Sequence, residues 1–464
     1  MEKKQGLNIN VKSFITALVV IFALMVASFA LTLVIPGGEY ARIPDANGNM
    51  IIDTENGFTY VDGGIPFWKW ALSPILVLGA AGNGTLIAVI LFLLVIGGVF
   101  NALDHCGLMK YLLDKIVASF GKHRYALMAV ITLFFMSMGS LIGSFEEVIP
   151  LVPIVVALAV NLGWDALTGA GMSLLAAGCG FAAGVFNPFT VGVAQQLAGL
   201  PMFSGASMRI LTFVLIYLLL WFFLRSHAQK IEKPLGEAAT NAFVSDPKME
   251  RGMITFAIPL GLGIATIFCS GFIPALQDYT MIIVAAAFLI AGTSACLAAK
   301  MGGKKFGKTF VQGITVIFPA VLMILMASSI RFTLEEAHIL DTILHGAVEL
   351  AQVMPKWAVV LFIYGVVLVM NFFVSSGSAK AFMLIPLIVP IASVFGISSQ
   401  LCILAFAFGD GFSNVLYPTN AALLIGLGVA DVSYVDWFKW TIKFQIATLT
   451  LTSLLLLLGL AVGY

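Results

Sequence analysis

Hydrophobic positions along this chain form long blocks, and polar positions gather in short stretches between them. A helix needs about 20 consecutive apolar residues to cross a bilayer. The blocks that approach or exceed this length lie at 14–35, 85–103, 208–224, 252–273, 281–299, 311–330 and 438–463. Since these blocks have the length of membrane-spanning helices, the pattern predicts an all-α polytopic membrane protein. The first block is longer than the apolar core of a signal peptide and is therefore interpreted as a retained transmembrane helix. A signal peptide is the minor alternative for this block.

Two further regions, 139–201 and 375–431, interrupt this pattern in the same way. Each has two short apolar arms around a polar tip, followed by a longer apolar segment that a Gly-rich run breaks before a proline. GSFEEVIPLVPIV in the first region aligns with GSAKAFMLIPLIVPI in the second, and GFAAGVFNPFT aligns with GFSNVLYPTN. Interrupted segments at matching positions of two halves are typical of a transporter's binding site.

Charge predicts opposite orientations for the two copies. The stretch 104–125 before the first copy is basic, whereas 332–355 before the second is acidic and contains no Lys or Arg. By the positive-inside rule, the first stretch is expected in the cytoplasm and the second outside. We therefore predict inverted-topology repeats, in about nine full spans plus two re-entrant hairpins. The hairpins are expected at 126–162 and 357–395, and the broken helices at 167–200 and 401–429.

The expected domain organisation follows from this topology. The first repeat covers 1–225, a cytoplasmic linker covers 226–251, an inverting helix covers 252–273, and the second repeat covers 279–464. The last span, 438–463, then leaves the C-terminus outside, while the N-terminus lies in the cytoplasm. The multi-pass chain is expected in a bacterial-type inner membrane.

Composition supports the membrane interpretation. Hydrophobic residues make up 60% of the chain and charged residues 10%, and the mean hydropathy is +1.05. These values are far from those of a water-soluble globular domain. The five cysteines are scattered without a C-x-x-C motif, and H-E-x-x-H and P-loop motifs are absent from the sequence. A zinc site, a disulfide framework, an ATP-driven pump and a metalloprotease are therefore disfavoured, and no metal site or cofactor is expected.

Four motifs in order carry a family resemblance: GSFEEVIPLVPI, GFAAGVFNPFTVGVAQQLAGLP, SSGSAKAFMLIPL and AFAFGDGFSNVLYPTN. In these motifs the chain resembles the YfcC and ArcD-like basic amino acid antiporter group of the ion transporter superfamily. This group is similar to the C4-dicarboxylate anaerobic carriers. The resemblance covers nearly the whole chain and implies two hairpins and two broken helices around a central site. The chain is more distantly similar to sodium-coupled divalent-anion symporters, whose hairpin tips carry Ser-Asn-Thr and help to hold sodium. Here the tips read SFEE and GSAKA.

Each break is expected to leave free backbone N–H groups and a positive helix end near the membrane midplane, suited to a substrate carboxylate. Asn187 and Pro188 form an N-cap and N1 pair, and Pro418 is expected to play the corresponding part after Tyr417. Further side-chain donors and acceptors at the breaks are Thr190, Asn414, Thr419 and Asn420. Local capping of a kinked helix is the alternative role for them.

Four ionisable residues are predicted at membrane depth, namely Glu146, Glu147, Lys380 and Asp410. An ionised side chain there costs about 2.5 to 3.5 kcal/mol, so each needs a partner, a proton or water. One interpretation is an internal ion pair, for instance between Lys380 and Asp410. Another assigns one of Glu146 and Glu147 to a cationic substrate group or a transported proton. Only one is assigned, because adjacent helical residues point about 100° apart and do not face the same site. Lys380 then replaces a bound metal cation or clamps a substrate carboxylate.

The candidate substrate-binding and ion-binding set also includes the serines of the hairpin tips, Ser144, Ser376 and Ser378. If all four ionisable residues are charged, three acids and one base favour a substrate with a carboxylate and excess positive charge. We expect an alternating-access secondary transporter, not an enzyme, that exchanges or imports amino acids such as arginine and ornithine, coupled to a proton or sodium. A C4-dicarboxylate or acidic amino acid carrier is the alternative, and a membrane enzyme or channel is remote. The expected partners are the lipid bilayer, a small-molecule substrate and a second copy of the chain, but no nucleic acid.

Overall fold

In the computed structural model of the protein, the residues that can be described are 11–44, 50–52, 57–80, 84–120, 123–143, 145–201, 203–234, 245–270, 279–351 and 354–464. Within these residues, eight helical segments are long and apolar enough to cross a membrane, and two shorter apolar helices accompany them. The prediction of an all-α polytopic membrane fold is confirmed.

The first half of the chain forms helices where the apolar blocks predict them. The elements outside the first broken helix are α1 (Val11–Val34), α4 (Gly84–His105), α5 (Leu108–Phe120), α6 (Arg124–Ile142), the 3₁₀ helix η3 (Glu146–Leu151), α7 (Val152–Asn161) and α11 (Ala206–Ile231). The broken helix consists of α8 (Ala166–Ala170), the π-helical turn η4 (Gly171–Leu175), α9 (Ala176–Ala183), the π-helical turn η5 (Pro188–Gly192) and α10 (Val193–Leu197).

The second half of the chain is also helical in its described residues. Its elements are α13 (Pro247–Ser270), α15 (Thr280–Ala298), α16 (Gly303–Glu336), α17 (Leu340–Ala351), α18 (Lys356–Phe373), α19 (Gly377–Val394), α20 (Ser399–Gly411), the 3₁₀ helix η6 (Phe412–Val415), α21 (Ala421–Val429) and α22 (Tyr434–Val462). The hairpin arms α6, α18 and α19 have 18 or 19 residues, long enough to span by themselves. The re-entrant character of the hairpins, the inverted repeat and the domain limits therefore stay predictions.

The polar loop after α1 contains short elements that the sequence pattern did not predict. Strands β1 (Gly38–Tyr40) and β4 (Phe58–Tyr60) pair antiparallel, as do β2 (Arg42–Pro44) and β3 (Met50–Ile52). Short helical segments follow, namely α2 (Phe67–Ala71), α3 (Ser73–Leu76) and the 3₁₀ turn η1 (Val77–Gly79). Strands of three residues are too short for an alternation of polar and apolar positions to reveal them.

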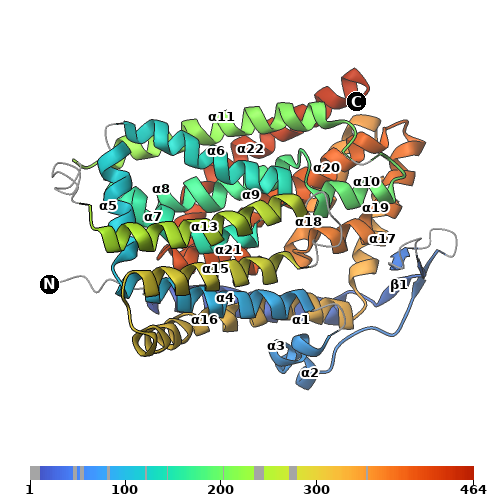
Figure 1. Cartoon of the computed structure of the whole chain (residues 1–464). Helices are drawn as coiled ribbons and strands as arrows, with labels where there is room; N and C mark the ends of the chain where they lie inside the picture. The colour runs from blue at the N-terminus through green and yellow to red at the C-terminus, as the bar shows by residue number, and fades with distance from the viewer. Residues whose placement is uncertain are drawn as a thin grey trace.

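The helices form two layers (Figure 1). Helices α1, α4, α13, α15 and α16 pack mainly against one another, and the hairpins, the broken helices, α11 and α22 form the other group. In Figure 1, α1, α4 and α16 lie along the lower side of the molecule, while α6, α11 and α22 lie along the upper side. The two regions with interrupted apolar segments therefore share one layer.

Ion pairs at the two ends of the layers join segments that lie far apart in the sequence. At the end that carries β1, Arg42 Nη2 lies 2.8 Å from Asp341 Oδ2 of α17, and Lys69 pairs with Glu336. At the opposite end, Lys115 Nζ of α5 lies 2.6 Å from Glu250 Oε1 of α13. The loop between α1 and α4 thus meets the acidic helix α17 at one end, and the basic helix α5 lies at the other (Figure 1).

Glycines bring the first hairpin close to the first broken helix. A Cβ atom added to Gly180 of α9 would lie 1.8 Å from the carbonyl oxygen of Met136, and one added to Gly139 would lie 2.0 Å from the carbonyl oxygen of Ala177. Small residues allow such close backbone contact between membrane helices. Helices α6 and α9 therefore pack backbone against backbone.

Replacing Gly180 with alanine should destabilise the protein, because the new methyl group meets backbone atoms that no rotamer change can move. Overpacking of this kind costs about 1 to 3 kcal/mol of unfolding free energy. Thermal unfolding of the detergent-solubilised protein measures the effect. Gly365→Ala in α18 is the matched control, since its added Cβ meets nothing within 4 Å. An unchanged midpoint for Gly180→Ala would contradict the close contact.

Candidate functional site

The two broken helices contact each other beside their breaks. The first break lies between Ala183, the end of α9, and Pro188, the start of η5, and Gly184 there has a left-handed φ of +53°. The second lies between Val415 and Ala421. A Cβ added to Gly411 would lie 2.2 Å from Cα of Ala182, so the two helices touch beside their breaks. The geometry brings the polar residues of both breaks into one region.

Asn187 caps the second part of the first broken helix. Its Oδ1 atom accepts hydrogen bonds from Phe189 N at 3.0 Å and Thr190 N at 3.3 Å, and Pro188 is the first residue of η5. The predicted N-cap and N1 arrangement is confirmed here. Because the cap already satisfies two backbone N–H groups, the local capping role holds for Asn187. Thr190 is buried, and its hydroxyl has no hydrogen-bond partner among the described residues.

In the second break, the prediction that Pro418 starts the half-helix is wrong. Helix α21 begins at Ala421, and Asn420 Oδ1 accepts hydrogen bonds from Ala422 N at 2.9 Å and Leu423 N at 3.4 Å. Pro418 lies in the preceding turn. The fixed φ of proline suits a turn as well as a first helical residue, and the Asn side chain determines where the helix starts. Thr419 is buried in this turn.

The backbone of both breaks is held by neighbouring elements. In the first break, Arg209 Nε of α11 donates to Val185 O at 3.3 Å, and Ser140 accepts from Val185 N at 3.1 Å and Phe186 N at 3.0 Å. In the second break, Trp437 Nε1 of α22 donates to Val415 O, and Tyr434 Oη donates to Leu416 O, both at 2.8 Å. Helix α11 thus donates a hydrogen bond to a carbonyl group of the first break, and helix α22 donates to two carbonyl groups of the second.

Arg209 is fully buried but was not among the sequence candidates. It lies near the start of the predicted span 208–224. The proline and glycine signals that located the break gave no indication of which side chain would hold its carbonyl groups.

Lys380 and Asp410 form an ion pair between the second hairpin and the second broken helix. Lys380 Nζ lies 2.7 Å from Asp410 Oδ1, and both side chains have no exposed surface. The ammonium also donates to Val374 O at 2.6 Å and to Asn371 Oδ1. Of the alternatives open from the sequence, the structure has the internal ion pair. At the start of α19, Ser376 Oγ caps the helix by accepting from Ala379 N, and Ser378, two residues further along the chain, is half-buried.

Asn371 of α18 connects this ion pair to the second break. Its Nδ2 atom lies 3.0 Å from Asp410 O, 2.6 Å from Ser413 Oγ and 2.9 Å from Asn414 Oδ1. Asn414 Oδ1 also accepts from Asn420 Nδ2 at 3.0 Å. Asn371 was not among the sequence candidates, although it is a buried amide in the otherwise apolar run VVLVMNFF, four residues before the tip. The isolated polar residue in this apolar run was the sequence signal that could have identified Asn371 as a site residue.

Replacing Asn371 with leucine, which is close in size, should lower stability and transport. The ammonium of Lys380 loses an acceptor, and Ser413 and Asn414 lose a donor, at a cost of about 1 to 3 kcal/mol. Thermal unfolding and uptake into proteoliposomes measure the two effects. Asn161→Ala is the matched control, because Asn161 is exposed and bonds only to its own helix through Ala157 O. Equal behaviour of the two variants would contradict the connecting role of Asn371.

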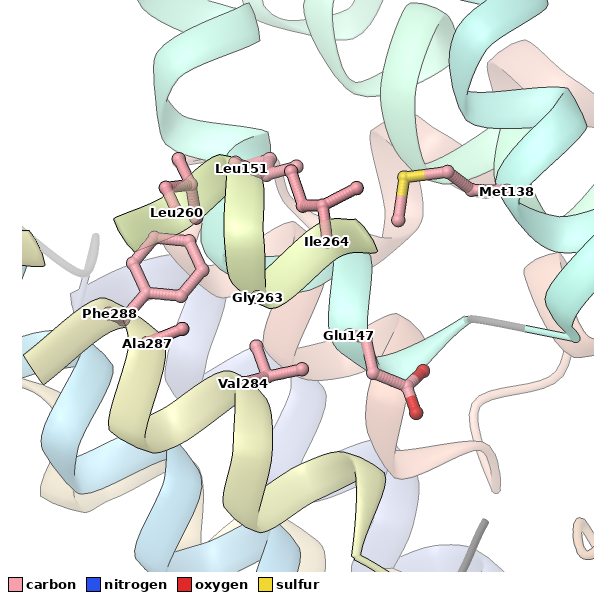
Figure 2. A pocket seen from close by; sticks show the side chains of 9 residues that line it. All are labelled: Met138, Glu147, Leu151, Leu260, Gly263, Ile264, Val284, Ala287 and Phe288. Carbon is pink, nitrogen blue, oxygen red and sulfur yellow. The ribbon is translucent and has the colours of Figure 1, made fainter. Parts of the chain in front are cut away.

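The two glutamates of the first tip lie in η3 and have different surroundings. Glu146 is half-buried and lies within electrostatic range of Asp410. Glu147 is 7% exposed and lines a small cavity between the two layers. Figure 2 shows its carboxylate at the edge of that cavity, turned away from Phe288. The third tip candidate, Ser144, lies outside the described residues.

The start of the first broken helix has its own hydrogen-bonded pair, Asp165 and His227. Asp165 Oδ1 caps α8 by accepting from Thr168 N at 2.8 Å, and Asp165 Oδ2 lies 3.0 Å from His227 Nε2 of α11. Burial raises the pKa of Asp165, but the hydrogen bonds from His227 and Thr168 outweigh burial and lower it overall. The negative charge at this helix end is therefore maintained at neutral pH.

Charges at the site are mostly paired internally. Lys380 is paired with Asp410, and the partly exposed Arg331 of α16 pairs with Glu335 at 2.7 Å. Among the described residues, no group of three or more His, Cys, Asp or Glu could hold a metal ion.

Comparison with known proteins identifies relatives over most of the chain. The profile of DcuC, the C4-dicarboxylate anaerobic carrier family, matches residues 14–461. YfcC of Escherichia coli (strain K12), named as a candidate basic amino acid antiporter, is 30% identical over 386 residues, which cover 77% of this chain and 74% of YfcC. An uncharacterised protein of Haemophilus influenzae is 24% identical over 96% of each chain.

A solved structure, the YdaH transporter of Alcanivorax borkumensis, covers 97% of this chain and 98% of its own, with 16% identity and a TM-score of 0.44. The sequence matches confirm the resemblance to the YfcC group and identify a multi-pass membrane transporter. The chain belongs to the C4-dicarboxylate anaerobic carrier family.

Proposed function

We propose that this transporter is a secondary carrier for amino acids, with basic amino acids such as arginine and ornithine as its first substrates. It exchanges or imports them by alternating access. The candidate antiport of basic amino acids by YfcC supports this substrate class, since YfcC is 30% identical to the chain.

The observation that carries the proposal is the pairing of Lys380 with Asp410. With both side chains fully buried and 2.7 Å apart, the pair is neutral as a whole and offers no free positive charge to an anion. Glu146 then leaves a negative charge at the first tip. This charge favours a substrate with a cationic side chain, while the helix starts at the breaks suit its carboxylate.

A carrier for C4-dicarboxylates or acidic amino acids is the second candidate. The family description favours it, because the matching profile is that of C4-dicarboxylate carriers. Two helix N-termini near one centre would also suit two carboxylates. In this case Glu146 and Glu147 must be protonated or face away from the substrate.

Alternating access requires one part of the protein to move against another around the site. The two layers are suitable parts, because the cavity between them is lined mostly by apolar side chains. It is lined by Met138, Glu147, Leu151, Leu260, Gly263, Ile264, Val284, Ala287 and Phe288 (Figure 2). Apolar surfaces can slide without breaking specific hydrogen bonds, so we place the moving interface at this cavity.

The expected setting is a bacterial-type inner membrane, with the end that carries α5 in the cytoplasm. Lys115 and Arg124 lie at that end, whereas Asp341 and Glu336 belong to the end that carries β1. The positive-inside rule then orients the chain with its C-terminus outside.

Counterflow in proteoliposomes tests the proposal. Vesicles are loaded with unlabelled arginine, ornithine, lysine, aspartate, glutamate or succinate, and the matching labelled compound is added outside. We expect uptake with the basic amino acids to exceed uptake with succinate by at least about tenfold, a difference of about 1.4 kcal/mol. Counterflow with succinate or aspartate alone would contradict the proposal and support the second candidate.

A further inference from the structure

We infer that the second hairpin contains a monovalent-cation site that is permanently filled by the ammonium of Lys380. The lysine acts as a tethered cation, so Asp410 stays compensated without a bound sodium or potassium ion. This inference goes beyond the proposed substrate, because it concerns a different ligand.

The surroundings of Lys380 Nζ are those of a small cation. Three oxygens of different kinds face it: Asp410 Oδ1 at 2.7 Å, the backbone oxygen of Val374 at 2.6 Å, and Asn371 Oδ1. Carbonyl and carboxylate oxygens are the ligands that replace the hydration shell of a dehydrated cation. An ammonium has three N–H donors, so its capacity matches this set.

The position is closed to water and has further oxygen in reach. Lys380 and Asp410 have no exposed surface, and Asp410 Oδ2 accepts no hydrogen bond among the described residues. Gly377 lies between Asp410 and Thr190, since its added Cβ would be 2.9 Å from Asp410 Oδ2 and 2.5 Å from Thr190 Cγ2. The absent side chain at Gly377 thus lets both breaks approach the cation position.

The hairpin geometry explains why the lysine can serve this role. Val374 ends the first arm, Ser376 caps the second arm, and Lys380 lies one turn into α19. Its ammonium therefore returns to the carbonyl that the end of α18 leaves without an intrahelical partner. A metal ion at the same point would need the same carbonyl.

The test is to remove the ammonium and supply a free cation. In Lys380→Ala, sodium chloride should raise the thermal unfolding midpoint by about 3 °C or more relative to choline chloride at equal ionic strength, because an ion that binds only the folded state stabilises it. The wild type should show no difference between the two salts. Potassium chloride is tested in parallel, since site size decides between the two ions.

Two controls isolate the site. Lys380→Ala with Asp410→Asn removes the carboxylate, so the sodium effect should disappear, and Lys304→Ala removes an exposed lysine and should behave as the wild type. Absence of any sodium or potassium effect in Lys380→Ala would overturn the inference. Stabilisation of the wild type by sodium that Asp410→Asn abolishes would also overturn it, even if Lys380→Ala fails to fold. Neither result depends on which substrate is transported.

Discussion

Asp410→Asn should destabilise the protein by about 3 to 5 kcal/mol of unfolding free energy, the range for breaking a buried ion pair on one side. The ammonium of Lys380 keeps its contacts with Val374 O and Asn371 Oδ1 but loses the charge that compensates it. Since neither side chain reaches water, no solvent can replace the carboxylate. Chemical denaturation of the solubilised protein measures the loss.

Removing both charges should be less harmful than removing one. In Lys380→Met with Asp410→Asn, an apolar stem of similar length replaces the lysine, and we expect much of the lost stability to return. Glu335→Gln is the control for a pair near the surface, since the side chains of Arg331 and Glu335 are 34% and 42% exposed. It should change stability by less than about 1 kcal/mol. A double variant as unstable as Asp410→Asn would show that the pair does not act through its charge.

Glu146→Gln should lower counterflow of arginine and ornithine by about 30-fold or more, equivalent to about 2 kcal/mol or more, because it removes the carboxylate that we assign to the cationic group. Counterflow of citrulline, the uncharged analogue of arginine, should not fall in parallel. Labelled uptake at equal protein density measures both substrates.

Two variants accompany this measurement. Glu349→Gln alters a side chain that is 69% exposed on α17 and should leave counterflow unchanged. Glu147→Gln distinguishes the two tip glutamates, since Glu147 lines the cavity between the layers and Glu146 lies within electrostatic range of Asp410. If Glu147→Gln abolishes arginine counterflow and Glu146→Gln does not, the assignment of the substrate-binding acid is wrong.

Much of the helical framework could be predicted because long apolar blocks and basic or acidic stretches act locally. Both ends of helix α1 lie within three residues of the ends of the block at 14–35, and the breaks fall at the Gly-rich runs. Asn187 and Pro188 were predicted correctly because an N-cap depends on adjacent residues. Pro418 was misassigned because a proline followed by Thr419 and Asn420 fits a turn and a helix start equally well.

The candidate site was harder to predict because its contacts join residues far apart in the chain. The sequence offered Lys380 several partners, and only the packing of α19 against α20 selects Asp410. Asn371 and Arg209 were missed for the same reason, since their partners lie in other segments. An isolated amide or guanidinium in an apolar run indicates that a polar partner exists, but not which one.

The hydrogen bonds at the breaks bear on which parts of the protein can bend. Although Val185 and Phe186 are not helical, their amides are bonded to Ser140, and the nearby carbonyls are held by Arg209 in one break and Trp437 in the other. Amides bonded in this way exchange slowly with deuterium, as helical amides do. The unwound segments are therefore rigid and do not act as hinges. Each broken helix moves as one body with the helix that follows it.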